Sequence, residues 1–174
     1  MKIRILFALL ISSVLFASAE AQRRDYMTEA EIEIVRNNQE VDQRLFVLAQ
    51  MIDRRFTALG IDAGGPKFKK SENDWGDPPT GSRSDLLSDI KNIIEKAIDD
   101  IDNLAARMPE KTKEEKKGVN TFNKAVRDLA ASANRWLPHL RKEYDTAQDD
   151  KIRGSTAGAI EFCEQIIEAA SKLK

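Results

Sequence analysis

The side chains that could carry out covalent or metal chemistry in this chain are few. The sequence contains a single cysteine, Cys163, and a single histidine, His139. A lone Cys cannot form an intrachain disulfide or a cysteine-based zinc cluster, and a lone His cannot build a histidine-rich metal site. The spacing of Cys163 and His139 does not pair a nucleophile with a base. We therefore expect no catalytic residues and no enzymatic activity.

Both residues have simpler predicted roles. Di-iron helical bundles use Glu-x-x-His pairs, and the four residues before His139 contain no Glu, so we predict a surface or helix-kink histidine. Cys163 falls on an apolar helical stripe, where Cys behaves as a small buried hydrophobic residue. The alternative is an intermolecular disulfide, which an exported protein would be able to form.

Carboxylates are the remaining candidate ligands. Glu161, Glu164 and Glu168 share one helix face through their spacing of three and four residues. No calcium-loop motif accompanies them, so we predict a solvated face, with no metal and no cofactor. The 28 Lys and Arg residues nearly balance the 29 Asp and Glu residues, which argues against a nucleic-acid-binding protein with its basic excess.

The segment 60–82, rich in Gly and Pro, holds the predicted partner-binding residues. Connections longer than about 12–15 residues are unusual in compact domains and are often functional. Aromatic side chains are frequent anchors of protein interfaces. The predicted partner-binding set is Phe68, Trp75, Lys67, Lys69 and Lys70. The alternatives are that the two aromatic rings fold back onto the helices, or that the loop is mobile.

Helical periodicity predicts the elements that must position these groups. Apolar residues recur in steps of mostly three and four, and they predict helices over 28–59, 84–108, 112–147 and 150–173. No segment shows the alternation of a β-strand. The fold class is therefore all-α, and we predict an antiparallel bundle of four helices, each burying one narrow apolar seam. A three-helix bundle with long, bent members is the alternative.

Several local signals mark the predicted helix ends. Thr28 with Glu31 matches a capping box, as does Thr112 with Glu115. Gly60 follows the first helix at the position of a C-terminal glycine cap. Pro138 lies inside the third helix and predicts a kink, with a break at this residue as the alternative.

The first 21 residues have the pattern of a secretory signal peptide. Lys2 and Arg4 precede an apolar run over residues 5–16, and small residues follow it. We predict cleavage after Ala19 or Ala21. The apolar run is too short to span a bilayer, which needs about 20 residues. Residues 22–174 are then expected to form a single helical domain that is exported, periplasmic or secreted, and soluble.

A short segment at the start of the first helix resembles a known motif. Met27-Thr28-Glu29-Ala30-Glu31 is similar to the Leu-Thr-x-x-Gln motif of Spy-type periplasmic chaperones, which are small, exported and all-helical, with Met in place of Leu and Glu in place of Gln. A capping box accounts for the same residues. We transfer no functional residues from that family.

These features predict a function in general terms. We expect an exported helical bundle that acts through protein–protein contacts, as an envelope adaptor, an assembly factor or a structural component. A periplasmic holdase-like stress chaperone is one alternative, and a carrier of a small ligand or metal is another. Heptad spacing also permits self-association. The sequence determines neither the identity of a protein partner nor the oligomeric state.

Overall fold

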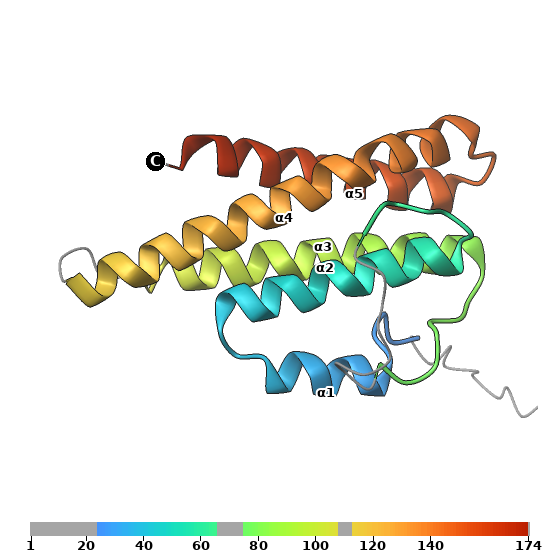
Figure 1. Ribbon diagram of the computed structural model, residues 1–174. Coiled ribbons are helices and arrows are strands. Elements are labelled where there is room, and N and C mark those ends of the chain that lie inside the picture. Colours follow the sequence, from blue (N-terminus) through green and yellow to red (C-terminus); the bar gives the residue numbers. More distant parts are fainter. Residues whose placement is uncertain (1–23, 66–74, 108–112, 174) are drawn as a thin grey trace, which may run out of the picture.

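A computed structural model describes residues 24–65, 75–107 and 113–173, with the side chains of residues 113–117 left out. Within these residues it contains helices and no strand (Figure 1), so the predicted all-α class is confirmed. The helices are α1 (Glu29–Asn37), α2 (Val41–Ala58), α3 (Arg83–Ala105), α4 (Lys113–Thr146) and α5 (Asp150–Lys172). The predicted signal peptide, residues 1–21, lies outside the described part of the chain.

The predicted helix over 28–59 is wrong, because the chain forms two helices there. The first ends at Asn37, and Asn38 caps it by donating a side-chain hydrogen bond to the Ile34 carbonyl oxygen at 2.7 Å. Glu40 is extended, and α2 begins at Val41. The interruption falls in the polar run 36–40, between Val35 and Val41, where no apolar residue favours continuation of the helix.

Tertiary packing supplies the reason for this break. After Asn38 the chain reverses, so that the start of α1 lies against the end of α2 (Figure 1). This hairpin buries Met27, Ile34 and Val35, each 7–8% exposed. A continuous helix would leave these side chains far from the core, so burial of apolar area favours the hairpin.

The predicted signals at the other helix ends are confirmed where the structure describes them. Thr28 and Glu31 form the reciprocal hydrogen bonds of a capping box. At the end of α2, the amides of Gly60 and Ile61 donate to the carbonyl oxygens of Thr57 and Phe56, which is a Schellman motif. Gly60 has φ 75°, a left-handed conformation that glycine adopts readily.

The remaining three helices end within a few residues of their predicted limits. Ser82 caps α3, and α3 stops at Ala105 rather than at residue 108. Helix α4 continues through Pro138, so the alternative of a break there is wrong. Thr112, the predicted cap of α4, lies outside the described residues.

The four longer helices pack in a ring in which α2 contacts α3 and α4, and α5 contacts the same two helices. Helices α2 and α3 are antiparallel, as are α4 and α5, whereas α2 runs parallel to α4 and α3 runs parallel to α5. Helix α1 packs mainly on α2, outside the ring. Among the described residues, no helix is both long and apolar enough to cross a membrane.

The core lies along the predicted seams. On α3 and α4, the fully buried seam residues are Leu87, Ile90, Ile94, Ala97, Ala133, Trp136 and Leu140. On α5 the seam is built of smaller side chains, with Thr156, Ala159 and Cys163 all at 0% exposure. Burial of this apolar area is the main stabilising contribution to the fold.

Candidate functional site

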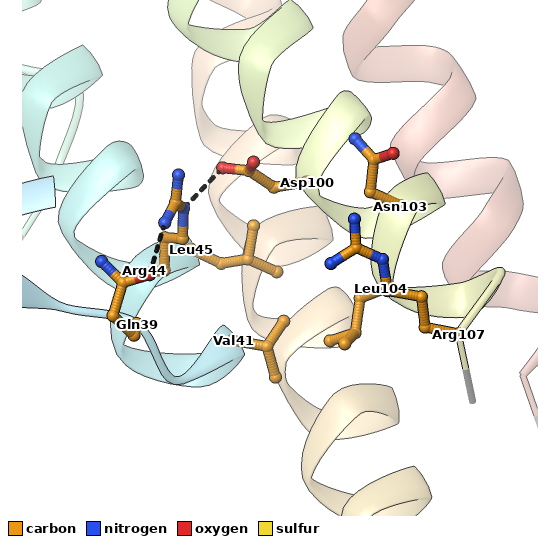
Figure 2. Close-up of a pocket in the computed structure, with 8 residues that line it drawn as sticks. All are labelled: Gln39, Val41, Arg44, Leu45, Asp100, Asn103, Leu104 and Arg107. Atoms are coloured by element: carbon orange, nitrogen blue, oxygen red, sulfur yellow. Dashed lines mark hydrogen bonds and ion pairs between the residues drawn. The ribbon is translucent and has the colours of Figure 1, made fainter. Parts of the chain in front are cut away.

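A pocket opens where α2 begins and α3 ends, beside the break between α1 and α2 (Figure 2). Its volume is about 310 Å³. The lining residues are Gln39, Val41, Arg44, Leu45, Asp100, Asn103, Leu104 and Arg107. We refer to this cavity as the Arg44 pocket. It exists because the chain reverses at residues 38–40 and because antiparallel packing brings the end of α3 to the start of α2.

One wall of the Arg44 pocket is held by a hydrogen-bonded ion pair. The Nε of Arg44 donates to Asp100 Oδ2 at 2.8 Å, and its Nη1 donates to Gln39 Oε1 at 3.4 Å (Figure 2). Lys96, one turn earlier on α3, donates to both oxygens of Asp100 at 3.1 and 3.2 Å. Asp100 is thus neutralised by two cations, and the Arg44 guanidinium is fixed in position.

The opposite wall carries a second guanidinium over an apolar floor. Val41, Leu45 and Leu104 form the floor, and Arg107 extends over Leu104 with its guanidinium turned toward Arg44 (Figure 2). Arg107 is exposed. Within the described part of the chain, its guanidinium makes no hydrogen bond or ion pair. The Arg44 pocket therefore combines an apolar surface with a surplus of positive charge, a suitable environment for an anionic group.

A second group of charges lies at the other end of α2 and is buried. The Glu31 carboxylate is 0% exposed, and it accepts hydrogen bonds from both Arg54 and Arg55. It also accepts the capping hydrogen bond from the Thr28 amide at 3.0 Å. Burial lowers the pKa of Arg54 despite the attraction of Glu31. This carboxylate therefore joins α1 to α2.

Asp89 on α3 extends this group, which we call the Glu31 cluster (Arg24, Glu31, Arg54, Arg55 and Asp89). All but Arg24, whose side chain is 40% exposed, are buried. Arg24 donates two hydrogen bonds to Asp89 at 2.7 and 2.8 Å, and Arg55 Nε lies 3.8 Å from the same carboxylate. Burial raises the pKa of Asp89, while the hydrogen bonds from Arg24 oppose that shift. Buried charges need such partners, because an unpaired one is strongly destabilising.

The cavity beside the Glu31 cluster, of about 400 Å³, lies among the segment preceding α1, the start of α1 and residues 77–80. Its two guanidiniums, from Arg24 and Arg55, are already engaged by Asp89 and Glu31. This leaves less capacity for a ligand here than in the Arg44 pocket.

A third polar contact joins α2 to α4. Asp53, 5% exposed, accepts a hydrogen bond from Trp136 Nε1 at 2.7 Å and two from Arg135 at 3.2 and 3.3 Å. Gly65 lies directly over this carboxylate, and a Cβ there would come within 2.1 Å of Asp53 Oδ2. The segment after α2 can pack this closely only with glycine at that position.

Of the predicted partner-binding residues, the structure describes only Trp75. Its side chain is 8% exposed and lies against the Arg54 guanidinium, 5.3 Å from the ring centroid. Phe68, Lys67, Lys69 and Lys70 lie outside the described residues. In this conformation the Trp75 ring is covered by its own chain, and its role in partner binding stays a prediction.

The other residues that the sequence analysis considered are packed in the fold or paired with neighbouring charges. Cys163 is buried, as the seam position predicts, and burial raises the pKa of its thiol to about 12. His139 is half-buried, with its ring centroid 5.9 Å from that of Phe56. On the acidic face of α5, Glu164 pairs with Arg141 and Glu168 pairs with Lys172. Within the residues that the structure describes, no group of three or more His, Cys, Asp or Glu residues could hold a metal ion.

Sequence reasoning missed both the Arg44 pocket and the Glu31 cluster. Arg44 and Asp100 are 56 residues apart, and their spacing contains no motif. A weak signal did exist for the buried cluster, because the charged run Asp53-Arg54-Arg55 lies between Ile52 and Phe56 in an otherwise apolar stretch. Three consecutive charged residues on a helix point in different directions, so at least one of them faces a neighbouring helix.

Comparisons with protein-family models, with curated proteins and with solved structures find no match to this chain. The geometry of its own residues is therefore the basis for assigning a function.

Proposed function

We propose that this chain is an exported, non-enzymatic helical protein that works by binding another protein, as an adaptor, assembly factor or structural component. The observation that carries the proposal is the Arg44 pocket, which is lined by two guanidiniums and has an apolar floor. Interfaces combine an apolar centre with polar groups that set orientation, and Arg is enriched in them.

The rest of the fold supports such a role by holding the pocket in place. In this proposal α2–α5 act as a four-helix bundle, and α1 is a brace tied to it by the Glu31 cluster. Phe46, at the start of α2, is 56% exposed and does not line the Arg44 pocket.

Photo-crosslinking in the native cells tests the proposal directly. A photoreactive amino acid at position 103, whose Asn side chain is exposed and lines the Arg44 pocket, is expected to give a discrete adduct with a protein. The same amino acid at position 161, an exposed site on α5, is the matched control. The charge reversal Arg107→Glu is expected to reduce the adduct from position 103, because it replaces a cation that no described residue neutralises with an anion.

Two results would argue against this function. Equal adducts from positions 103 and 161 would indicate nonspecific contact, and an adduct insensitive to Arg107→Glu would place the contact outside the Arg44 pocket. Fractionation of the same cells, followed by N-terminal sequencing of the purified protein, tests the predicted export and cleavage after Ala19 or Ala21.

A further inference from the structure

We propose that the Arg44 pocket binds the C-terminal carboxylate of a partner polypeptide whose last residue is apolar. In this arrangement the carboxylate lies between Arg44 and Arg107, and the terminal side chain packs on Val41, Leu45 and Leu104. This inference rests on the proposed function and specifies the part of the partner that the pocket recognises.

Charge is the first step in the argument. Asp100 is the only carboxylate among the residues that line the Arg44 pocket, and Arg44 and Lys96 already engage it. Arg107 adds a cation that no described residue neutralises. The three cations thus exceed the one anion, and a single negative charge on a ligand would reduce this excess. A carboxylate also offers two oxygens, which match the planar N–H groups of guanidinium.

The apolar floor is the second step. Val41 and Leu45 are one turn apart on α2, and Leu104 lies across from them on α3 (Figure 2). Val41 and Leu104 are partly exposed and Leu45 is 2% exposed, so the first two supply most of the accessible apolar surface. A small hydrophilic anion would leave this surface uncovered. A ligand with an apolar group close to its charge covers the floor and reaches the cations at the same time.

The size of the pocket is the third step. A volume of about 310 Å³ is at the lower end of the range of roughly 300–1,000 Å³ that is usual for ligand sites. It suits one terminal residue rather than a large cofactor. In a chain end, the side chain and the carboxylate branch from the same Cα atom, so both fit a small cavity. An internal Asp or Glu carries its charge at the tip of its own side chain and has no apolar group of its own there.

Nuclear magnetic resonance titration of the isotope-labelled protein tests the inference. The probes are the peptide Gly-Ser-Gly-Ser-Leu with a free carboxylate, the same peptide as its C-terminal amide, and N-acetyl-leucine. We expect the free peptide to shift the methyl signals of Val41, Leu45 and Leu104. The amide is expected to bind at least about tenfold more weakly, because it lacks the charge that the guanidiniums recognise.

Matched variants separate the site from nonspecific attraction. Arg107→Gln is expected to weaken binding of the free peptide about tenfold. Arg36→Gln removes an equally charged, exposed arginine that pairs with Glu33 outside the pocket, and it is expected to leave binding unchanged. Equal binding of acid and amide, no methyl shift with the free peptide, or insensitivity to Arg107→Gln would each overturn the inference.

N-acetyl-leucine carries the carboxylate and the side chain of a terminal leucine without the rest of a chain. Because the pocket is proposed to take one terminal residue, we expect it to shift the same methyl signals as the free peptide, and no shift would overturn the size argument. The photo-crosslinking result is independent of this one. An adduct at position 103 without peptide binding retains the proposed function and removes the carboxylate inference. Peptide binding without an adduct supports the carboxylate site and argues against the proposed function.

Discussion

The two ends of helix α2 use charge in opposite ways. Near the end of the helix, the Glu31 cluster buries Glu31 and Arg55 at 0% and 1% exposure. Near its start, the side chains of Arg44 and Asp100 are 23% and 18% exposed, and Arg107 is open to solvent. Both groups contain arginines and carboxylates, so composition does not distinguish them. They differ in burial and in whether a cation is left without a partner among the residues that the structure describes.

This difference separates a structural role from a binding role. A buried ion pair must be closed, since removal of one partner leaves an uncompensated charge in a medium of low dielectric constant. An exposed charge contributes little to stability and is available to bind a ligand. The Glu31 cluster is therefore expected to resist substitution, and Arg107 of the Arg44 pocket to tolerate it.

The largest expected effect is that of Glu31→Gln. This change keeps a side chain that can form a capping box at the third helical position, but it leaves Arg54 and Arg55 buried without their carboxylate. We expect a loss of about 3–5 kcal/mol in the free energy of unfolding, measured by urea denaturation. Glu33→Gln on the same helix removes only an exposed pair with Arg36 and is expected to cost less than about 0.5 kcal/mol. Similar losses of stability for Glu31→Gln and Glu33→Gln would show that the buried ion pairs of Glu31 contribute no more than an exposed pair.

A smaller loss is expected for Asp53→Asn. The variant keeps an oxygen for Trp136 Nε1 and removes the charge that faces Arg135. A lost hydrogen bond to a charged group corresponds to about 1.5–3 kcal/mol, again measured by urea denaturation. Asp128→Asn is the control, because Asp128 is exposed and pairs only with Lys124 among the described residues. An unchanged free energy of unfolding in Asp53→Asn would show that the ion pair between Asp53 and Arg135 does not stabilise the fold.

Asp85 shows that a charged group need not be buried to have a perturbed pKa. Hydrogen bonds from Ser82 and Lys151 lower the pKa of Asp85 to about 2. A lowered pKa in the folded state means that the ionised carboxylate stabilises the fold above the unfolded-state pKa. That contribution is lost as the pH falls from about 4 to about 2.

The measurement for Asp85 is a titration of its side-chain carboxyl by nuclear magnetic resonance. Ser82→Ala removes the main donor, and we expect it to raise the pKa of Asp85 toward its usual value of 3.8. A pKa that does not change in this variant would show that hydrogen bonding by Ser82 is not the cause.

The smallest expected effect is that of Arg107→Gln on stability. Arg107 is exposed and has no partner in the described part of the chain, so we expect the free energy of unfolding to change by less than about 0.5 kcal/mol. Urea denaturation of this variant beside Glu31→Gln tests the two ends of α2 in one experiment. A loss above about 1 kcal/mol would assign Arg107 a structural role and weaken its proposed role in binding.

Much of the fold was predictable from local patterns. Steps of three and four residues placed the central parts of the buried seams of α3, α4 and α5, although Val119 at the start of the α4 seam is 36% exposed. The helical period decides which side chains share a face. The capping box at Thr28 and the glycine at position 60 marked helix ends through local hydrogen bonds and backbone conformation. These signals act over a few residues and are readable without any tertiary contact.

The errors arose where distant segments meet. The segment 28–59 has almost the same periodicity as one helix or as two, and only the burial of α1 against α2 favours the break at Asn38. Glu31 was interpretable as a capping residue alone, yet its carboxylate also binds Arg54 and Arg55 across the hairpin. A charged side chain can be hydrated at the surface or paired inside the fold, and the sequence does not indicate which.

The sequence by itself determined an all-helical chain, the seams of its last three helices and the position of Cys163 in one of them. Those properties follow from the spacing of apolar residues along a single helix. Only the tertiary structure decided that the chain reverses at Asn38, that Glu31 is buried between two arginines and that Arg44 and Arg107 line one pocket. Each of these depends on the distance between groups from different helices, and Coulombic and packing energies depend on that distance rather than on separation along the chain.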